Sequence, residues 1–306
     1  MLIEIVLLIL GLALLYIGGE QLVKSSVYLG ARLGLSTLVV GLTLVAFGTS
    51  APELAVSLDA ALTDHPDIAV ANIVGSNLAN IGLVAAVAAI AGKVVLNRDL
   101  VRKDLPIMLM VLGLLVWFIT DTALSRNEGM VLLGTLAGYI IYRIAAEKRQ
   151  TSGGTRETPS GRAITAAGGA ILGLALLTAG GDLLVSNAAS LAIRMGVSEA
   201  FIGFSIVAIG TSLPEIAASV AAVRLGHGAI AIGNVIGSNI WNSLGVLGVT
   251  AVAVPFDNIN IPWHLLAAMF GFSCLLLVVA IAAGRMGRRW GFTFLGTYLA
   301  YLVYSG

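Results

Sequence analysis

Long apolar stretches, separated by short polar interruptions, occupy almost the whole chain. A helix needs roughly 20 apolar residues to cross a bilayer. The pattern therefore predicts ten membrane-spanning helices, near residues 2–19, 36–61, 66–91, 104–120, 128–146, 164–180, 198–223, 228–254, 262–284 and 289–305. The one extended polar segment, residues 147–163, is expected to be a flexible linker between a first five-helix unit (1–146) and a second (164–306). The predicted fold class is an all-α integral membrane protein.

The composition agrees with this fold class and excludes several others. Of the 306 residues, 58% are hydrophobic and 11% are charged, whereas soluble domains carry about 25% charged residues. A soluble enzyme, a secreted disulfide scaffold and a disordered chain are therefore excluded. The net charge of +1 offers no basic surface for nucleic acid. No cofactor and no obligatory protein partner are indicated, so the lipid bilayer is the expected surrounding.

The distribution of Lys and Arg predicts an orientation. If the ten helices are correct, 15 of the 17 basic residues lie on one side of the membrane, and Arg126 and Arg194 lie on the other. Short cytoplasmic loops are enriched in Lys and Arg. We therefore expect a multi-pass protein of the cell membrane, with a cytoplasmic central linker and both termini outside.

The second half of the sequence repeats the first with an offset of 162 residues. Three matching segments are LALLYIGGE (12–20) with LALLTAGGD (174–182), FGTSAPE (47–53) with IGTSLPE (209–215), and NIVGSNLAN (72–80) with NVIGSNIWN (234–242). Because each half has an odd number of predicted helices, the two halves would have opposite orientations in the membrane. Inverted repeats of this kind are typical of secondary transporters, whose ion sites lie where the repeats meet.

Polar residues within the second and seventh predicted helices mark the candidate site. Pro52 and Pro214 each remove a backbone donor, so carbonyls near Thr49 and Thr211 should be released from the helix and broken helices are expected. One helix face then carries Ala46, Thr49, Ser50 and Glu53, and its counterpart carries Ala208, Thr211, Ser212 and Glu215.

The third and eighth predicted helices add a second polar stripe. It consists of Asn72, Ser76 and Asn80 in the first half and Asn234, Ser238 and Asn242 in the second. Asn77 and Asn239 lie about 100° around the helix from the serines that precede them. We assign these two asparagines to bonding between helices.

Carboxylates, hydroxyls, amide oxygens and carbonyls together form a set of oxygen ligands. Such ligands suit Ca2+, and equally Na+, whereas zinc and copper are disfavoured because no thiolate or imidazole lies at these positions. Two unpaired glutamates in a membrane are costly, so a cation or protons should neutralise Glu53 and Glu215.

The motifs GTSAPE with GSNLAN, repeated as GTSLPE with GSNIWN, resemble the two alpha-repeats of the sodium/calcium exchanger family within the cation/Ca2+ exchanger superfamily. The resemblance covers nearly the whole chain and implies a compact prokaryotic member. It also implies two inverted five-helix repeats with broken helices 2 and 7 at the core. Access would alternate as helices 1 and 6 move against the other eight.

The resemblance assigns ion ligands by position. They fall on Ala46, Thr49, Ser50, Glu53, Ser76 and Asn80, and on Ala208, Thr211, Ser212, Glu215, Ser238 and Asn242. By the same resemblance, Glu53 and Glu215 ligate Ca2+ with the carbonyls of Thr49 and Thr211, and the remaining residues complete Na+ sites. K+-dependent members carry Asp where this chain has Asn242, so Na+/Ca2+ exchange without K+ is favoured.

Three other functions are weighed against this one. An H+/Ca2+ exchanger would use protonated glutamates in place of Na+. A passive cation channel is disfavoured, because paired carboxylates beside broken helices favour occlusion over fast conduction. A membrane enzyme is disfavoured too, because the sequence shows no nucleophile–histidine pair. The chain is therefore expected to be a transporter and not an enzyme.

Overall fold

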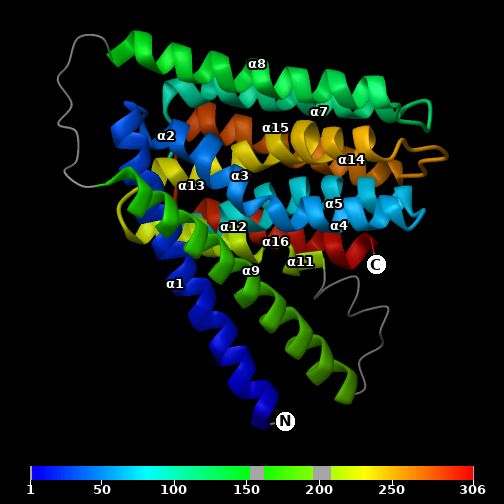
Figure 1. Cartoon of the computed structure of the whole chain (residues 1–306), viewed down its shortest axis with the longest axis horizontal. Helices are drawn as coiled ribbons and strands as arrows, with labels where there is room; N and C mark the ends of the chain where they lie inside the picture. Colours follow the sequence, from blue (N-terminus) through cyan, green and yellow to red (C-terminus); the bar gives the residue numbers. More distant parts are fainter. Residues whose placement is uncertain (1, 152–161, 196–207, 306) are drawn as a thin grey trace.

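The computed structural model describes residues 2–151, 162–195 and 208–305 (Figure 1). Within these residues the protein is almost entirely helical. In chain order the elements are α1 (Leu2–Leu33), α2 (Thr37–Val40), η1 (Gly41–Val45), α3 (Ala46–Thr49), α4 (Ala51–Leu62), α5 (Pro66–Ala79), η2 (Asn80–Val84), α6 (Ala85–Ala91), β1 (Val94–Val95), η3 (Leu100–Asp104), α7 (Leu105–Ile119), α8 (Arg126–Thr151), α9 (Ala163–Arg194), α11 (Ala208–Gly210), α12 (Leu213–Arg224), α13 (Gly228–Ile240), η5 (Trp241–Val246), α14 (Leu247–Ala253), α15 (Trp263–Ala283), β2 (Arg285–Met286) and α16 (Arg288–Ser305). The segments labelled η are π-helical turns that continue neighbouring α-helices.

Six helices of the described residues are long and apolar enough to cross a membrane, and a seventh is added if the bent pair Thr37–Thr49 and Ala51–Leu62 counts as one. That pair is bent by 43°. The helical, membrane-spanning character predicted from the sequence is confirmed. The full count of ten would need α7, α12 and α16 as well, which are shorter or more polar, and residues 198–207 of the seventh predicted helix lie outside the described residues.

Two helices are much longer than the sequence pattern predicts. The pattern ends the first helix near residue 19 and the sixth near residue 180, but α1 and α9 each have 32 residues. Polar side chains do not end a helix when they find partners along it, and Glu20 pairs with Lys24 one turn later at 2.7 Å. At 1.5 Å per residue each helix is about 48 Å long, longer than a bilayer core, which accommodates such helices by tilt. In Figure 1, α1 and α9 run obliquely to the other helices.

Glycines bring α1 and α9 into backbone contact as an antiparallel pair. A Cβ atom at Gly11 would lie 3.0 Å from the carbonyl oxygen of Gly180, and one at Gly18 would lie 2.8 Å from that of Gly173. Gly173 and Gly180 are the repeat counterparts of Gly11 and Gly18. Gly11 thus packs against the counterpart of Gly18, and Gly18 packs against the counterpart of Gly11. Two elements related by a two-fold axis make reciprocal contacts of this kind.

The π-helical turn η1 and helix α13 also pack backbone to backbone. A Cβ at Gly41 would lie 2.5 Å from the Ile230 carbonyl oxygen, and one at Gly233 would lie 2.6 Å from that of Leu38. Small residues permit such close approach of membrane helices. The contact places the break between α3 and α4 directly beside α13.

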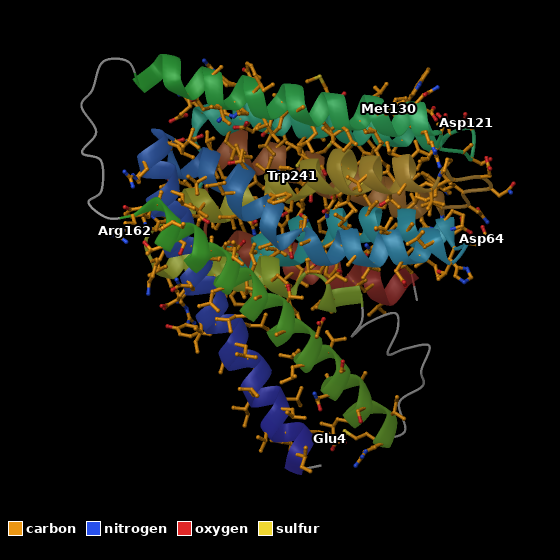
Figure 2. The ribbon with its side chains drawn as sticks, in the orientation of Figure 1. Glu4, Asp64, Asp121, Met130, Arg162 and Trp241 are labelled. Atoms are coloured by element: carbon orange, nitrogen blue, oxygen red, sulfur yellow. The ribbon has the colours of Figure 1, made fainter. Side chains whose placement is uncertain are left out.

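The two ends of the helix bundle differ in the charges they carry. Figure 2 shows Asp64 and Asp121 at one end, and Arg162 at the opposite end. α8 extends to Thr151, so the first residues of the expected linker are helical. Residues 152–161 of that linker lie outside the described residues.

Candidate cation-binding site

Two helix breaks with the same local structure form the centre of the site. α3 ends at Thr49 and α4 begins at Ala51, with Ser50 at φ −81° and ψ 4° between them. In the second half, Ser212 lies between α11 and α12 at φ −87° and ψ 2°. Pro52 and Pro214 stand at the first turn of the helix that follows each break, where a missing N–H costs nothing. The broken helix expected at Pro52 is confirmed, and a matching break lies before Pro214, where residues 196–207 are outside the described residues.

Glu53 and Glu215 lie in the first turns after the two breaks, 1% and 0% exposed. Glu53 lies four residues after Thr49, whose hydroxyl donates to Asn234, and Asn234 in turn donates to the carbonyl of Glu215. The two glutamates predicted from distant parts of the sequence are therefore neighbours within one buried site.

Many oxygens around these glutamates are buried without a hydrogen-bond partner among the described residues. They are Oε2 of Glu53, both carboxylate oxygens of Glu215, the hydroxyls of Ser50, Ser212 and Ser238, and Oδ1 of Asn80 and Asn242. A buried polar atom without a partner is costly. A cation coordinated by these oxygens would satisfy them, and the donor set therefore fits a hard cation.

Two asparagines of the predicted polar stripe brace the backbone of the site. Nδ2 of Asn72 donates to the Glu53 carbonyl over 3.2 Å and to Ser57 Oγ over 2.9 Å. Nδ2 of Asn234 donates in the same way to the Glu215 carbonyl, over 3.4 Å, and to Ser219. Both side chains hold the helix that carries the glutamate, so their role is to position it.

Asn77 and Asn239 bond between helices, as predicted. Nδ2 of Asn77 donates to Ser243 Oγ over 2.9 Å, and Oδ1 of Asn239 accepts from Nδ2 of Asn80 over 3.0 Å. The second bond also orients Asn80, because its amide nitrogen is engaged and its Oδ1 has no partner among the described residues. The bond to Asn239 thus leaves Oδ1 of Asn80 available in the buried site.

The carbonyl of Ala46 is less available than the sequence suggests. It accepts a hydrogen bond from Ser50 N over 3.0 Å. A carbonyl oxygen has two lone pairs, and this bond engages one of them. Ala208 begins α11, and its side chain lies outside the described residues.

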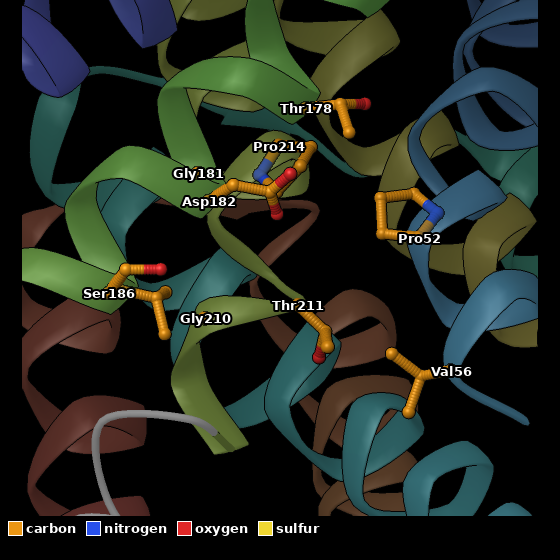
Figure 3. A pocket seen from close by; sticks show the side chains of 10 residues that line it. Pro52, Val56, Thr178, Gly181, Asp182, Ser186, Gly210, Thr211 and Pro214 are labelled. Atoms are coloured by element: carbon orange, nitrogen blue, oxygen red, sulfur yellow. The ribbon is translucent and has the colours of Figure 1, made fainter. Parts of the chain in front are cut away.

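Thr211 differs from the other predicted ligands because it is partly exposed. It borders a pocket of about 420 Å3 between α4, α9 and α12, shown in Figure 3. Thr178, Asp182 and Ser186 of α9 line the same pocket. Their spacing of four residues is visible in the sequence and places them on one helix face. The predicted helix ends near residue 180, however, which puts Asp182 at a solvated helix end and not in a pocket. The pocket therefore places one carboxylate, that of Asp182, beside the second helix break.

Among the described residues there is no group of three or more His, Cys, Asp or Glu side chains that could hold a metal ion. The site therefore combines two carboxylates with neutral hydroxyl, amide and carbonyl oxygens. Its formal charge of −2 matches one Ca2+ ion or two monovalent ions. Hard cations with oxygen coordination are the class that such a site selects.

Comparison with known proteins adds independent information. The family model described as sodium/calcium exchanger protein matches residues 3–145 and 165–306. The inner membrane protein YrbG of Escherichia coli K12 is 35% identical, over 94% of this chain and 90% of its own length. The sodium/calcium exchanger MaX1 of Methanosarcina acetivorans is 30% identical, over 98% of both chains. A solved structure of the sodium-calcium exchanger NCX_Mj superposes with a TM-score of 0.85 at 30% identity, covering 99% of each chain.

Proposed function

This chain belongs to the sodium/calcium exchanger protein family, and we propose that it is an antiporter that exchanges Ca2+ against Na+ across the cell membrane. The observation that carries the proposal is the buried pair Glu53 and Glu215, which is surrounded by oxygens without hydrogen-bond partners among the described residues. Membership of the family makes the protein a membrane exchanger and not an enzyme. The choice of Na+ as the counter-ion is the finer proposal.

Competition for one pair of carboxylates would couple the two ions. Two negative charges in a medium of low dielectric constant require neutralisation. Either one Ca2+ ion or two Na+ ions can neutralise them, so the two kinds of ion compete for the site. Thr49, Thr211, Ser50, Ser212 and the remaining predicted ligands would complete the coordination of either ion. Because Asn242 adds an oxygen but no charge, no third cation such as K+ is required.

The proposed architecture has ten helices in two inverted five-helix repeats, 1–146 and 164–306, joined by a cytoplasmic linker. Two structural observations support it. Gly11 and Gly18 pack reciprocally against the counterparts of each other, and Asn72 and Asn234 make matching bonds to the two glutamate carbonyls. Arg162 lies at the end of the bundle opposite Asp64 (Figure 2), in keeping with both termini outside.

Alternating access would arise from movement of α1 and α9 together against the remaining helices. Their glycine-mediated contact makes them one tilted unit. The pocket beside Thr211 lies between α9 and the broken helices, where a shift of α9 would open or close the route to Glu215.

Proton-coupled exchange is the second candidate, because the two carboxylates that bind Na+ could also bind protons. The test is Ca2+ uptake into proteoliposomes with an opposing gradient of Na+, of K+ or of pH. Uptake driven by Na+ alone is expected. Sustained uptake from a pH gradient in Na+-free buffer would establish the proton-coupled function instead.

A further inference from the structure

Two loops far apart in the sequence are tied together at one end of the bundle. β1 and β2 pair antiparallel, with Val94 opposite Met286 and Val95 opposite Arg285. The N–H of Leu96 also donates to the carbonyl of Gly284 over 3.0 Å. Gly284 has φ +61°, a conformation that favours glycine and turns the chain from α15 into β2. The backbone therefore fixes the loop after α6 against the loop between α15 and α16.

This pairing surrounds a hollow of about 670 Å3 with positive charge. Its lining includes Lys93, Arg285, Arg288 and Arg289, and it includes no carboxylate among the described residues. None of these four residues forms an ion pair with a carboxylate of the described part of the chain, whereas Lys24 and Lys103 each pair with an acid one turn away. Like charges gathered without compensation raise the local potential and attract anions.

The backbone adds to the positive potential. α16 begins at Arg288 and has no acidic residue in its first turn, so the positive end of its dipole lies at the hollow. The guanidinium of Arg288 is held in place, because its Nε donates to the carbonyl of Ile90 over 3.3 Å. At least one of the four cations is therefore positioned by the fold.

One side chain of the hollow is of a type common at the membrane–water interface. Trp290 lines it and is half-buried, and tryptophan is enriched where a helix meets the membrane–water interface. The C-terminus lies at the other end of α16 in Figure 1, so the hollow is at the end of the bundle opposite the C-terminus. Basic pockets between membrane helices near the interface suit phosphate headgroups.

We infer that the hollow formed by Lys93, Arg285, Arg288 and Arg289 binds the phosphate of an anionic phospholipid headgroup. The bound headgroup bridges the two paired loops. It thereby stabilises α16 against α6, where a Cβ at Gly291 would lie 2.7 Å from the Ala86 carbonyl oxygen. Free phosphate carries the same kind of negative charge, but only the phosphate of a lipid is held beside the hollow by acyl chains in the bilayer.

The test uses the full-length protein in phosphatidylcholine nanodiscs, to which phosphatidylglycerol or inorganic phosphate is added. The thermal unfolding temperature and the lipid retained in native mass spectrometry are measured. The variant is Arg285→Gln/Arg289→Gln, and Arg102→Gln/Arg224→Gln is the control that removes the same charge from exposed positions outside the hollow. Arg285→Lys/Arg289→Lys keeps the charge and covers the case in which the Gln variant does not fold.

Phosphatidylglycerol should stabilise the wild type, the control and the Lys variant in a saturable manner. The Gln variant should need about tenfold more lipid or more for the same shift. Equal stabilisation of the wild type and the Gln variant would overturn the inference, as would the absence of any shift in the wild type. A saturable shift of equal size with inorganic phosphate alone would show a site for a soluble anion and would also overturn it.

Discussion

The hydroxyl of Thr49 donates a hydrogen bond to Oδ1 of Asn234 over 3.1 Å, within the buried centre of the protein. Thr49 ends α3 in the first half of the chain, and Asn234 belongs to α13 in the second. Nδ2 of the same asparagine holds the carbonyl of Glu215. The helix break of one half is therefore connected through a single side chain to the carboxylate-bearing helix of the other.

Substitution of Thr49 tests this connection. Thr49→Val removes the donor and leaves Oδ1 of Asn234 buried without that partner, which should cost about 1–3 kcal/mol of stability. Apparent Ca2+ affinity should fall as well, because Asn234 no longer holds Glu215 as firmly. Thr49→Ser keeps the hydroxyl and should retain most of both properties. Denaturation and Ca2+ flux are measured together, and wild-type values for Thr49→Val would contradict the proposed role.

Removal of either carboxylate should abolish transport. Glu53→Gln or Glu215→Gln leaves a dehydrated cation with one charge too few, at a cost of about 3 kcal/mol or more, or about a hundredfold in affinity. Ca2+ uptake into proteoliposomes is the measurement. Glu128→Gln is the matched control, because Glu128 lies in the first turn of α8, where its carboxylate accepts hydrogen bonds from Ser125. Near wild-type uptake by either site variant would refute the assignment.

A change at Asn242 tests the charge of the site. Oδ1 and Nδ2 of Asn242 are buried without partners among the described residues, so Asn242→Asp places a third negative charge beside the two glutamates. An additional cation or proton is then required for neutrality. We expect Ca2+ transport that is stimulated by K+ or inhibited more strongly by acid than in the wild type. The measurement is Ca2+ flux of the wild type and of Asn242→Asp, titrated against K+ and against pH. Identical curves for the two proteins would place Asn242 outside the cation-binding site.

The glycine contact between α1 and α9 should be intolerant of even one methyl group. Gly18→Ala places Cβ 2.8 Å from the Gly173 carbonyl oxygen, and overpacking of this kind costs about 1–3 kcal/mol. Reduced thermal stability and slower exchange are expected. Gly168→Ala serves as the control, because a Cβ there has no neighbour within 4 Å among the described residues. If the two variants behaved alike, the α1–α9 contact would not limit the movement.

Asp182 should contribute to cation capture without being essential. It lines the pocket beside Thr211. Its charge should favour Ca2+ binding by about 1 kcal/mol at low ionic strength, which lowers the apparent KM about fivefold. Asp182→Asn should raise KM by that amount, and the effect should fade in high salt. Asp121→Asn, at the far tip of the bundle (Figure 2), should leave KM unchanged. A large loss of maximal rate in Asp182→Asn would instead indicate a direct ligand.

The sequence by itself determined the centre of the site. Within an apolar helix, a proline loses a backbone hydrogen bond and a glutamate buries a charge. Both costs arise at the residue itself, so the sequence alone marks Pro52 and Glu53, and Pro214 and Glu215, as candidates. The repeat with an offset of 162 residues pairs them. The structure confirms the helix break at Pro52, has a matching break before Pro214 and places the two glutamates together.

Only the tertiary structure decided what each polar side chain does. Asn72 and Asn80 belong to the same predicted stripe, yet Asn72 braces a backbone carbonyl and Asn80 bonds to Asn239. The lengths of α1 and α9 and the position of Asp182 in a pocket are likewise not apparent from the pattern. The physical reason is that a hydrogen bond depends on which donor and acceptor meet. Thr49 and Asn234, for example, are 185 residues apart in the chain, beyond any local periodicity.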